Sequence, residues 1–284
     1  MSCNIALSAD SACDFNNSFK KKFKVDCFPF HIHLDGKEYK DGVDINPKFI
    51  FEVYKEKKLI PKTSAISVDE YESHFASLLS KNKEVIHVSL SGAVSSTYKN
   101  ALKASERLSN IYVVNSCSLS FGIGILIMEA SYKIAKGINA KQILEELNEL
   151  RNRIEVSFIV STLDFINSGG RCPSIVTLGL NFFNIKPCIK IDNKQGKMKI
   201  SKIYRGKLGV VLPKYIKDKI KDKIIANSTV FLVHSGIEKK LLNKVKTSIL
   251  KCNKKILNIV EARTGCAITS HCGPETLGIA FLKA

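Results

Sequence analysis

Short apolar runs alternate with longer stretches of helical periodicity along the first half of the chain. Ile5–Ser8, Val85–Ser89 and Ile111–Val114 are short, rich in β-branched residues and bounded by turn residues, which is typical of buried strands. Helical periodicity follows over Ser96–Ser109 and Phe121–Lys136. The order strand, helix, strand, helix predicts a parallel or mixed sheet covered by helices.

The ends of the predicted helices carry recognisable capping residues. Gly137 follows the second helix, in the position where glycine closes many helices. Asn139 predicts the N-cap of a further helix, whose apolar positions include Ile143, Leu147 and Leu150. Helices and strands therefore continue to alternate up to the middle of the chain.

The second half begins at Ser157–Thr162 and has a different spacing of elements. Candidate strands follow at Cys188–Ile191, Lys199–Ile203, Thr229–Val233 and Ile256–Val260. A turn at Asn193–Gly196 joins two of them as a hairpin, and helices are expected at 208–224 and 238–252. The whole pattern predicts an α/β protein with two α/β domains. Residues 1–157 should hold a parallel sheet flanked by helices, and residues 158–284 a mixed sheet with helices, although no linker marks the boundary.

Basic residues are concentrated in one segment. The chain has 44 Lys and Arg against 26 Asp and Glu, and residues 185–260 hold 20 of the former against four of the latter. This segment fits an acidic partner, transient contact with an anionic membrane, or a plain solvated lysine surface. Nucleic acid is not expected as a partner, because Arg205 is the only arginine there and no RNA-binding signature is present. Tyr215–Ile225 places isoleucines on one helical stripe, which suits either a membrane surface or packing against the protein.

Cysteine usage and the N-terminal sequence bear on metal binding and location. None of the nine cysteines forms a C-x-x-C pair, so neither a zinc site nor any other metal site is expected. An odd cysteine count suggests reduced thiols. The N-terminus has no basic flank followed by an apolar run, and no stretch is long and apolar enough to span a bilayer. We therefore expect a cytoplasmic protein.

The segment S-G-A-V-S-S-T-Y at 91–98 is the most informative local feature. It lies between a predicted strand and a predicted helix, where free N–H groups and the helix dipole favour an anion. Ser95, Ser96 and Thr97 add hydroxyl donors at that point. A simple N-cap would explain one serine equally well. The segment has neither the P-loop pattern nor the G-x-G-x-x-G pattern of nucleotide-binding proteins.

Other polar residues also stand at predicted loops. T-S-A-I-S at 63–67 contributes Thr63 and Ser64, whereas Ser67 with Glu70 predicts a helix capping box. Asp10 and Ser11 end the first predicted strand, where the loops of open α/β folds line a ligand crevice. Further candidates are Arg171, in the turn Ser168–Arg171, and His271, beside a Gly-Pro turn.

Taken in order, these motifs resemble those of the DegV family of bacterial fatty-acid-binding proteins, which includes the FakB subunit of fatty acid kinase. The matching segments are D-S-A-C-D at 10–14, T-S-A-I-S at 63–67, S-G-A-V-S-S-T-Y at 91–98, V-N-S at 114–116, L-D-F-I-N-S-G-G-R at 163–171, I-K-P at 185–187, Arg205, H-S-G at 234–236 and S-H-C-G-P at 270–274. The resemblance covers nearly the whole chain.

The resemblance implies a function and a set of site residues. A long-chain fatty acid would lie in the first domain, with a ligand cleft between and within the domains. Its carboxylate would be held by Thr63, Ser95 and His271, with Ser64, Ser96, Thr97, Asp10 and Ser11 in supporting loops. Arg171 and Arg205 would face a separate ATP-dependent kinase subunit, which converts the presented acid to an acyl-phosphate for phospholipid synthesis. The chain would need no cofactor and would not itself be an enzyme.

Three positions depart from the family motifs. Ile66 replaces a proline, which predicts a less rigid loop, and Ser96 replaces a glycine at a helix start that serine should also cap. Glu275 replaces a glycine, so a positive φ there would strain the backbone, and its carboxylate would raise the pKa of His271. An alternative function is a serine hydrolase acting on acyl esters, with Ser95 as nucleophile and His271 as base, although no G-x-S-x-G motif is present.

Overall fold

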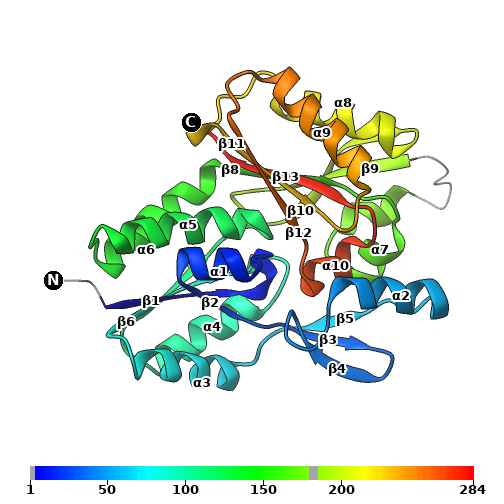
Figure 1. The fold of residues 1–284 in the computed structure, drawn as a ribbon. Helices are drawn as coiled ribbons and strands as arrows, with labels where there is room; N and C mark the ends of the chain where they lie inside the picture. The colour runs from blue at the N-terminus through cyan, green and yellow to red at the C-terminus, as the bar shows by residue number, and fades with distance from the viewer. Residues whose placement is uncertain (1–3, 179–184) are drawn as a thin grey trace.

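The structure is a computed structural model that describes residues 4–178 and 185–284. Its strands form three sheets (Figure 1). The first sheet and its helices make the lower part of the view, and a larger second sheet makes the upper part. A small third sheet lies at the lower right, and the last helix of the chain descends toward it. The predicted α/β fold, with a parallel first sheet and a mixed second sheet, is confirmed.

The first sheet is parallel and has the strand order β2-β1-β6-β7. Its strands are β1 (Ile5–Asp10), β2 (Val25–Phe28), β6 (Glu84–Ser89) and β7 (Ile111–Asn115). Three of these strands were predicted from their apolar runs, whereas β2 was not. Because all four strands run the same way, the loops that follow β1, β6 and β7 gather at one edge of the sheet.

Helices cover both faces of the first sheet. They are α1 (Asn17–Phe23), α3 (Val68–Leu79), α4 (Thr97–Glu106), α5 (Phe121–Ala135) and α6 (Ala140–Leu150). Helices α3 and α4 bury their apolar residues against one face, and α1, α5 and α6 pack on the other. The predicted caps are present: the Asn139 side chain accepts from Gln142 N, and Ser67 and Glu70 form a complete capping box.

The second sheet is mixed, with the order β10-β9-β8-β13-β11-β12. Its strands are β8 (Ile154–Ile159), β9 (Ile185–Ile191), β10 (Met198–Arg205), β11 (Thr229–His234), β12 (Asn258–Arg263) and β13 (Leu277–Leu282). The β9–β10 hairpin was predicted, whereas β13 was not. The expected domain boundary between residues 157 and 158 falls inside β8, and a division before Ile154 would keep both large sheets whole.

Helices α8 (Leu208–Ile220) and α9 (Lys239–Cys252) cover the outer face of the second sheet. Ile216 and Ile220 are fully buried in this layer, whereas Ile224, beyond the helix, is 65% exposed. The isoleucine stripe of residues 215–225 therefore serves packing against the sheet rather than forming a free apolar helix face. The inner face of the sheet turns toward α5 and the first half of the chain.

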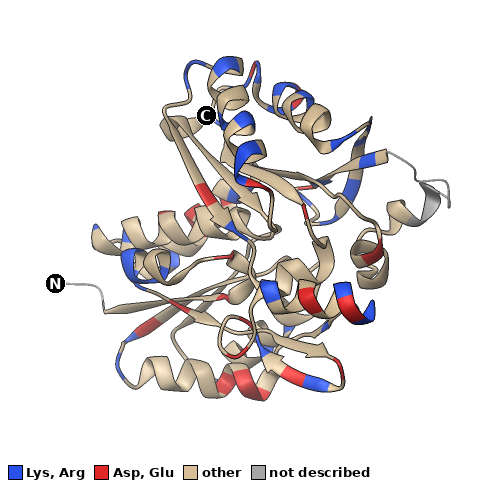
Figure 2. Ribbon diagram, turned by 45° about the vertical axis from the view of Figure 1, so that its right-hand side comes forward, with Lys and Arg blue, Asp and Glu red and all other residues tan. Residues whose placement is uncertain are grey.

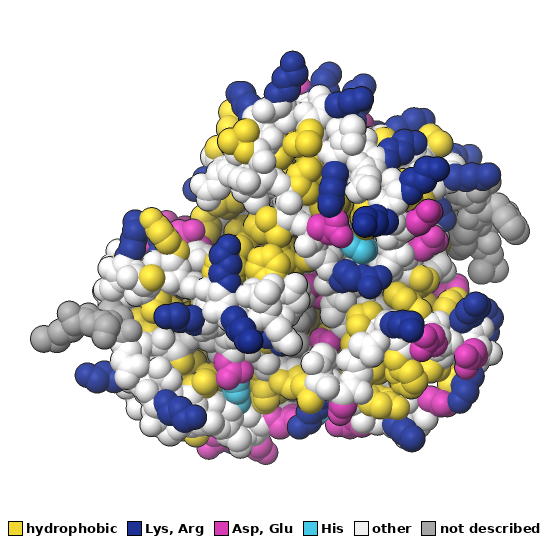
Figure 3. Space-filling model, in the orientation of Figure 1, with side chains coloured by type: hydrophobic (Ala, Val, Ile, Leu, Met, Phe, Trp, Pro, Cys, Tyr) yellow, Lys and Arg dark blue, Asp and Glu magenta, His cyan; other side chains and the backbone are white. Residues whose placement is uncertain are grey.

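The basic segment forms much of the outer surface of the upper part. Lys and Arg residues gather along the helices of the upper part in the ribbon (Figure 2), and their side chains cover much of its surface with few acidic side chains between them (Figure 3). Some of these lysines form ion pairs, such as Lys202 with Asp218 and Lys246 with Glu261. The segment is thus a positively charged surface, on the face of the sheet that lies away from the first half.

The small third sheet links the two halves. Its order is β4-β3-β5, with β3 (His31–Leu34), β4 (Lys37–Lys40) and β5 (Lys62–Ser64) all antiparallel. Helix α2 (Pro47–Lys57) follows β4, and α7 (Asp164–Gly169) follows β8. Helix α10 (Cys266–Cys272), near the end of the chain, packs against α2, β3 and β5. Residues more than 200 positions apart in sequence therefore meet here.

Candidate functional site

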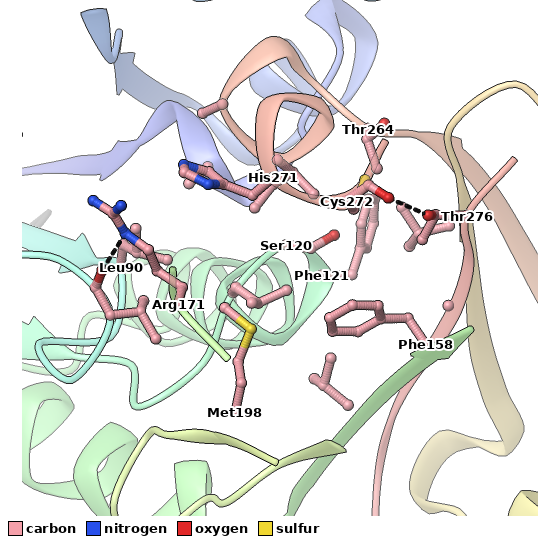
Figure 4. Close-up of a pocket in the computed structure, with 18 of the residues that line it drawn as sticks. Leu90, Ser120, Phe121, Phe158, Arg171, Met198, Thr264, His271, Cys272 and Thr276 are labelled. Atoms are coloured by element: carbon pink, nitrogen blue, oxygen red, sulfur yellow. Dashed lines mark hydrogen bonds between the residues drawn. The ribbon is translucent and has the colours of Figure 1, made fainter. Parts of the chain in front are cut away.

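A cavity of about 200 Å³ lies between the first half of the chain and the inner face of the second sheet. Its walls come from the loops after β1, β6 and β7, from the start of α5, and from β8, β11, β13 and α10 (Figure 4). Because a single water molecule takes up roughly 10–15 Å³ of such a cavity, the space holds more than a dozen water-sized groups. Residues from both halves line it, which is the kind of cleft between and within the two halves that the family resemblance implied.

Most of the wall is apolar. The apolar side chains that line the cavity are Ala12, Phe30, Ala65, Leu90, Val94, Leu119, Phe121, Val156, Phe158, Ile166, Met198, Val233, Ala267, Ile268, Ile279 and Ala280. Phe121, Phe158, Ile279 and Ala280 are buried, so this part of the cavity is closed off from water. Such a wall favours an aliphatic group by the hydrophobic effect.

The hydroxyl groups in this apolar part already have partners within the protein. The contacts are Ser157 Oγ with Tyr215 Oη (3.0 Å), Thr276 Oγ1 with Cys272 O (2.7 Å), Thr264 Oγ1 with Thr269 Oγ1 (2.8 Å) and Ser120 Oγ with the Asp14 carboxylate. These hydroxyls donate to or share a proton with protein atoms, which leaves them little capacity to bind a polar ligand group. The apolar end of the cavity therefore offers little to a charged or strongly polar group.

The opposite end of the cavity is polar and reaches the surface. Thr63 Oγ1 lies 2.8 Å from His271 Nε2, which joins β5 to α10. Ser95 Oγ accepts from Thr97 N at 3.2 Å, and no acceptor for its O–H is found in the described part of the chain. Ser96 and Arg171 are exposed at this end. Arg171 donates to the carbonyls of Val94 and Gly169, and its guanidinium lies on the same side of the cavity as His271 (Figure 4).

His271 is a neutral side chain at physiological pH. Burial, and next the charge of Arg171, lower the pKa of His271 to about 4. Its Nδ1 atom is buried and has no hydrogen-bond partner among the described residues. Gly169 allows the ring to lie this close, since an added Cβ would come 2.4 Å from Nδ1. The imidazole therefore lies with Nδ1 against Gly169 and Nε2 against Thr63, at the polar end that also carries the free hydroxyl of Ser95.

The expectation that Glu275 raises the pKa of His271 is wrong. Glu275 lies in the turn after α10, and its carboxylate accepts from Ser161 Oγ at 3.3 Å, away from the histidine. The second expectation about this position is confirmed. Glu275 has φ of 54°, in the left-handed region where its side chain costs free energy that glycine would not.

A buried carboxylate holds the loop that carries Ser95. Asp10 accepts from Leu90 N (2.7 Å), Ser89 Oγ (2.8 Å), His87 Nε2 (3.1 Å) and Tyr71 Oη. Burial opposes ionisation, but hydrogen bonds and charge from His87, with further bonds from Tyr71 and Leu90, hold the pKa of Asp10 below its usual value. Tyr71 also bonds Thr97 Oγ1 at 2.9 Å. Asp10 and Thr97 therefore position the loop and do not line the cavity.

Two more buried carboxylates from the first half hold the N-terminus of α10. Asp14 accepts from Gly265 N and Asp41 from Cys266 N, both at 2.7 Å. Ser11 Oγ donates to Asp41 at 2.7 Å, so Ser11 also acts behind the cavity wall. Burial raises the pKa of both carboxyls, and for Asp14 the neighbouring Asp41 raises it further. The opposite end of α10 carries His271, so these contacts set the position of a residue at the polar end.

The remaining candidates have mixed outcomes. Ser64 does not line the cavity, because its Oγ lies 3.0 Å from His33 Nε2. Ser96 is the N-cap of α4 as expected, but its side chain makes no capping bond. Ile66 is fully buried, and its carbonyl accepts from Asn100, so packing holds this loop. Arg205 is exposed at the end of β10 and does not line the cavity, in contrast to Arg171.

The geometry does not support a serine hydrolase. His271 Nε2 is engaged by Thr63 rather than by Ser95, and Ser95 Oγ accepts a backbone N–H. No carboxylate bonds the imidazole of His271 in the described residues, so the base of a catalytic triad has no orienting acid.

The sequence did not reveal the part of the wall that comes from the second half. Ala267, Ile268 and Cys272 lie on α10, and Phe158 on β8. Their small or apolar side chains resemble any core residue in sequence. The one available signal was S-L-S-F-G at 118–122, a polar loop between a predicted strand and the predicted helix over Phe121–Lys136.

Residues 4–178 and 185–284, which the structure describes, contain no disulfide, metal-binding cluster or membrane-spanning helix. The eight cysteines of these ranges are free thiols, and Cys3 lies outside them. In the same ranges, no cluster of three or more His, Cys, Asp or Glu side chains could bind a metal ion. No helix of residues 4–178 or 185–284 has the length and apolar character needed to cross a membrane.

Comparison with known proteins agrees with this fold. The model of the DegV family, described as "Uncharacterised protein, DegV family", matches residues 4–284, and the chain belongs to this family. A DegV domain-containing protein of Caldanaerobacter subterraneus subsp. tengcongensis is 29% identical over 281 residues, which cover 98% of each chain.

Solved structures share the fold over nearly the whole chain. A DegV family protein from Thermus thermophilus, described by its fatty acid binding, has a TM-score of 0.85 and 25% identity, covering 99% of this chain and 100% of that one. A protein from Thermotoga maritima, described as revealing fatty acid binding function, has a TM-score of 0.83 and 23% identity, with coverages of 99% and 100%. These structural neighbours bind fatty acids.

Proposed function

We propose that this chain binds one long-chain fatty acid in the cavity between its two halves. The carboxylate lies at the polar end beside Thr63, Ser95 and His271, and the acyl tail runs along the apolar wall toward Phe158 and Ala280. One observation carries the proposal: hydrogen-bonding groups at the open end retain free capacity, whereas the hydroxyls along the apolar end are engaged by protein atoms. The fatty-acid binding of structural neighbours supports it.

The acyl tail supplies most of the affinity. A tail of about 14 methylenes, each worth ~0.8 kcal/mol when buried, gives roughly 11 kcal/mol before the costs of association and ordering are subtracted. The apolar wall has no free charged group along it among the described lining residues. Free energy from the tail therefore does not depend on the identity of the headgroup.

The polar end gives the orientation and the selectivity for an acid. The Ser95 O–H is free to donate to a carboxylate oxygen. In the neutral His271 tautomer that carries its hydrogen on Nε2, this nitrogen donates to Thr63 Oγ1 and leaves the Thr63 O–H free to donate as well. Hydrogen bonds to a charged acceptor are stronger than neutral ones. Arg171 adds a positive charge at the mouth of the cavity. These donors and the charge of Arg171 suit a carboxylate better than an ester or an alcohol, because neither of the latter carries a negative charge.

We further propose that the bound acid is presented to a separate ATP-dependent kinase subunit, in support of phospholipid synthesis. Ser96 and Arg171 are exposed at the polar end, so a partner would reach one carboxylate oxygen there. That oxygen would attack the γ-phosphorus of ATP held by the partner, and ADP would leave. This chain supplies desolvation and positioning and no catalytic group.

The partner surface in this proposal includes Arg171 and Arg205. Arg205 lies at the end of β10, and η3 (Pro173–Leu178), which follows Arg171, packs beside this strand. The basic surface of residues 185–260 would attract an acidic kinase subunit, or an anionic membrane during exchange of fatty acid. A cytoplasmic location fits such a role.

The test compares a fatty acid with the fatty alcohol of equal chain length. Thr63→Ala with Ser95→Ala removes two headgroup hydroxyls, each worth at least about 1.5 kcal/mol toward a charged group, so affinity for the acid should fall roughly 100-fold. Affinity for the alcohol should change little. The matched control is Thr247→Ala with Ser248→Ala on α9, where Thr247 is exposed, Ser248 is half-buried and neither lines the cavity. Unchanged binding of the acid by a folded double variant would contradict the assignment of the headgroup site.

A further inference from the structure

Two thiols from neighbouring segments of the first half are in contact. Cys13 Sγ lies 3.7 Å from Cys27 Sγ, which is van der Waals contact between sulfur atoms. Cys13 is the last residue of the short helix η1 (Ser11–Cys13), which follows β1 directly. Cys27 lies on β2, at the edge of the first sheet. The two sulfurs need to approach by less than 2 Å to reach the disulfide bond length of about 2.05 Å.

The two thiols differ in their access to solvent. Cys13 is fully buried, and burial followed by the contact with Cys27 raises the pKa of its thiol well above the usual value. Cys27 is only partly buried and lies on an edge strand. An oxidant in solution would therefore meet Cys27 first, with Cys13 beside it as the second thiol.

The position of Cys13 connects it to the cavity. Its neighbour Ala12 lines the cavity wall, and its other neighbour Asp14 bonds the N-terminus of α10 and the Ser120 hydroxyl. Ser11, the first residue of η1, bonds Asp41, the second carboxylate at α10. The residues around Cys13 thus either line the cavity, as Ala12 does, or take part in the bonds that hold α10, as Ser11 and Asp14 do. A shift of η1 toward β2 disturbs both.

We propose that Cys13 and Cys27 form a reversible disulfide that lowers the affinity of the cavity for its ligand. With hydrogen peroxide as oxidant, the Cys27 sulfur attacks one peroxide oxygen and becomes a sulfenic acid; the O–O bond breaks, and the hydroxide that leaves takes up the Cys27 thiol proton as water. The Cys13 sulfur then attacks the Cys27 sulfur, the S–S bond forms, and the sulfenic oxygen leaves as water with the Cys13 proton. Two thiols and one peroxide thus give one disulfide and two waters.

The two parts of the proposal have separate readouts. Formation of the disulfide is independent of what the cavity binds, whereas its effect on affinity rests on the proposed function. Bringing the two sulfurs from 3.7 Å to bonding distance draws η1 and β2 together, so the wall at Ala12 and the bonds of Asp14 to α10 should both be perturbed. We expect the affinity for a fatty acid to fall about tenfold on oxidation and to recover on reduction.

The experiment treats the full chain with a small excess of hydrogen peroxide, and then maps its disulfides by mass spectrometry of peptides. The variants are Cys13→Ser, Cys27→Ser and, as a matched control, Cys252→Ser, which removes a partly buried thiol on α9. The wild type and the Cys252→Ser variant should give a peptide pair joined through Cys13 and Cys27. Fatty-acid affinity is measured on the oxidised and re-reduced samples of all four proteins.

Each outcome decides one part of the proposal. Oxidation of Cys27 without a Cys13–Cys27 peptide would overturn the disulfide itself. A joined peptide with unchanged affinity would overturn the link to the cavity. A protein that binds no fatty acid in either state, yet gives the joined peptide, would contradict the proposed function and leave the disulfide standing. Affinity that falls equally in oxidised Cys13→Ser and Cys27→Ser variants would assign the loss to another residue and overturn the proposal.

Discussion

Protonation of His271 should weaken the folded state in acid. Burial and the charge of Arg171 lower the pKa of this histidine to about 4, whereas an unfolded histidine titrates near its ordinary value of about 6.5. The native state therefore holds the neutral ring in a pH range where the unfolded chain already binds a proton. Stability that is present above pH 6.5 is lost as the pH falls from 6.5 to about 4, and the loss is complete below that pH.

The size of this loss follows from the difference between the two pKa values. A separation of about 2.5 pH units, at 1.36 kcal/mol for each unit, corresponds to roughly 3 kcal/mol of unfolding free energy. That figure is a large part of the roughly 5–15 kcal/mol typical of a whole domain. The effect should therefore be visible above the titration of other groups.

The assay is urea denaturation between pH 7 and pH 4 for the wild type and for His271→Gln. Glutamine has no titrating proton and can still bond Thr63, so the variant should lose about 3 kcal/mol less than the wild type over this range. His74→Gln is the matched control, because burial also lowers the pKa of His74 to about 4 and His74 does not line the cavity. It should flatten the curve in the same way.

Bound ligand separates the two histidines. A carboxylate beside His271 favours the protonated ring and should raise its pKa, whereas His74 should not respond. The pKa of each ring can be followed by NMR with and without fatty acid. Parallel stability curves for the wild type and His271→Gln would refute the reasoning about burial, and an unresponsive His271 in the presence of a bound acid would refute its place at the headgroup.

Two further substitutions test other parts of the site. Asp10→Asn removes a carboxylate that accepts four hydrogen bonds, so it should lower the free energy of unfolding by about 3 kcal/mol in urea denaturation at pH 7. It should also weaken the binding of a fatty acid, because Asp10 holds the loop that carries Ser95. A stability within about 0.5 kcal/mol of the wild type would contradict this role. Ala280→Leu adds volume to the apolar wall, so competition binding should show a shift in preference toward fatty acids with shorter chains. An unchanged preference for chain length would place the acyl tail elsewhere.

Local periodicity was sufficient to predict most of the first half. The strands at Ile5, Val85 and Ile111 and the helices that follow them have strong patterns and local caps, and each is present in the structure. Their order along the chain fixes a parallel sheet, which in turn places the S-G-A-V-S-S-T-Y segment at the edge where loops gather. The polar end of the cavity could thus be predicted in part.

The rest of the site depends on contacts between distant segments. Strand β5, which holds Thr63, is only three residues long and forms through pairing with β3 rather than from its own sequence. The contacts of Asp14 and Asp41 with α10 join positions more than 200 residues apart. Neither follows from periodicity, which reports local structure only.

The wrong expectation about Glu275 has the same origin. Sequence proximity suggested that its carboxylate would lie beside His271, four positions earlier. Helix α10 ends at Cys272, and the following turn, with its positive φ at Gly273 and Glu275, directs the carboxylate to Ser161 instead. The pKa of His271 is therefore lowered by burial and Arg171 rather than raised.

The most direct test of the central claim is native mass spectrometry of the chain purified from cells without added lipid, followed by identification of the small molecules that denaturation releases. The account predicts one long-chain fatty acid for each protein molecule, and its loss from the Thr63→Ala, Ser95→Ala double variant. An empty protein that also fails to take up added fatty acid, or one that releases a different class of molecule, would contradict the assignment of the cavity to a fatty acid.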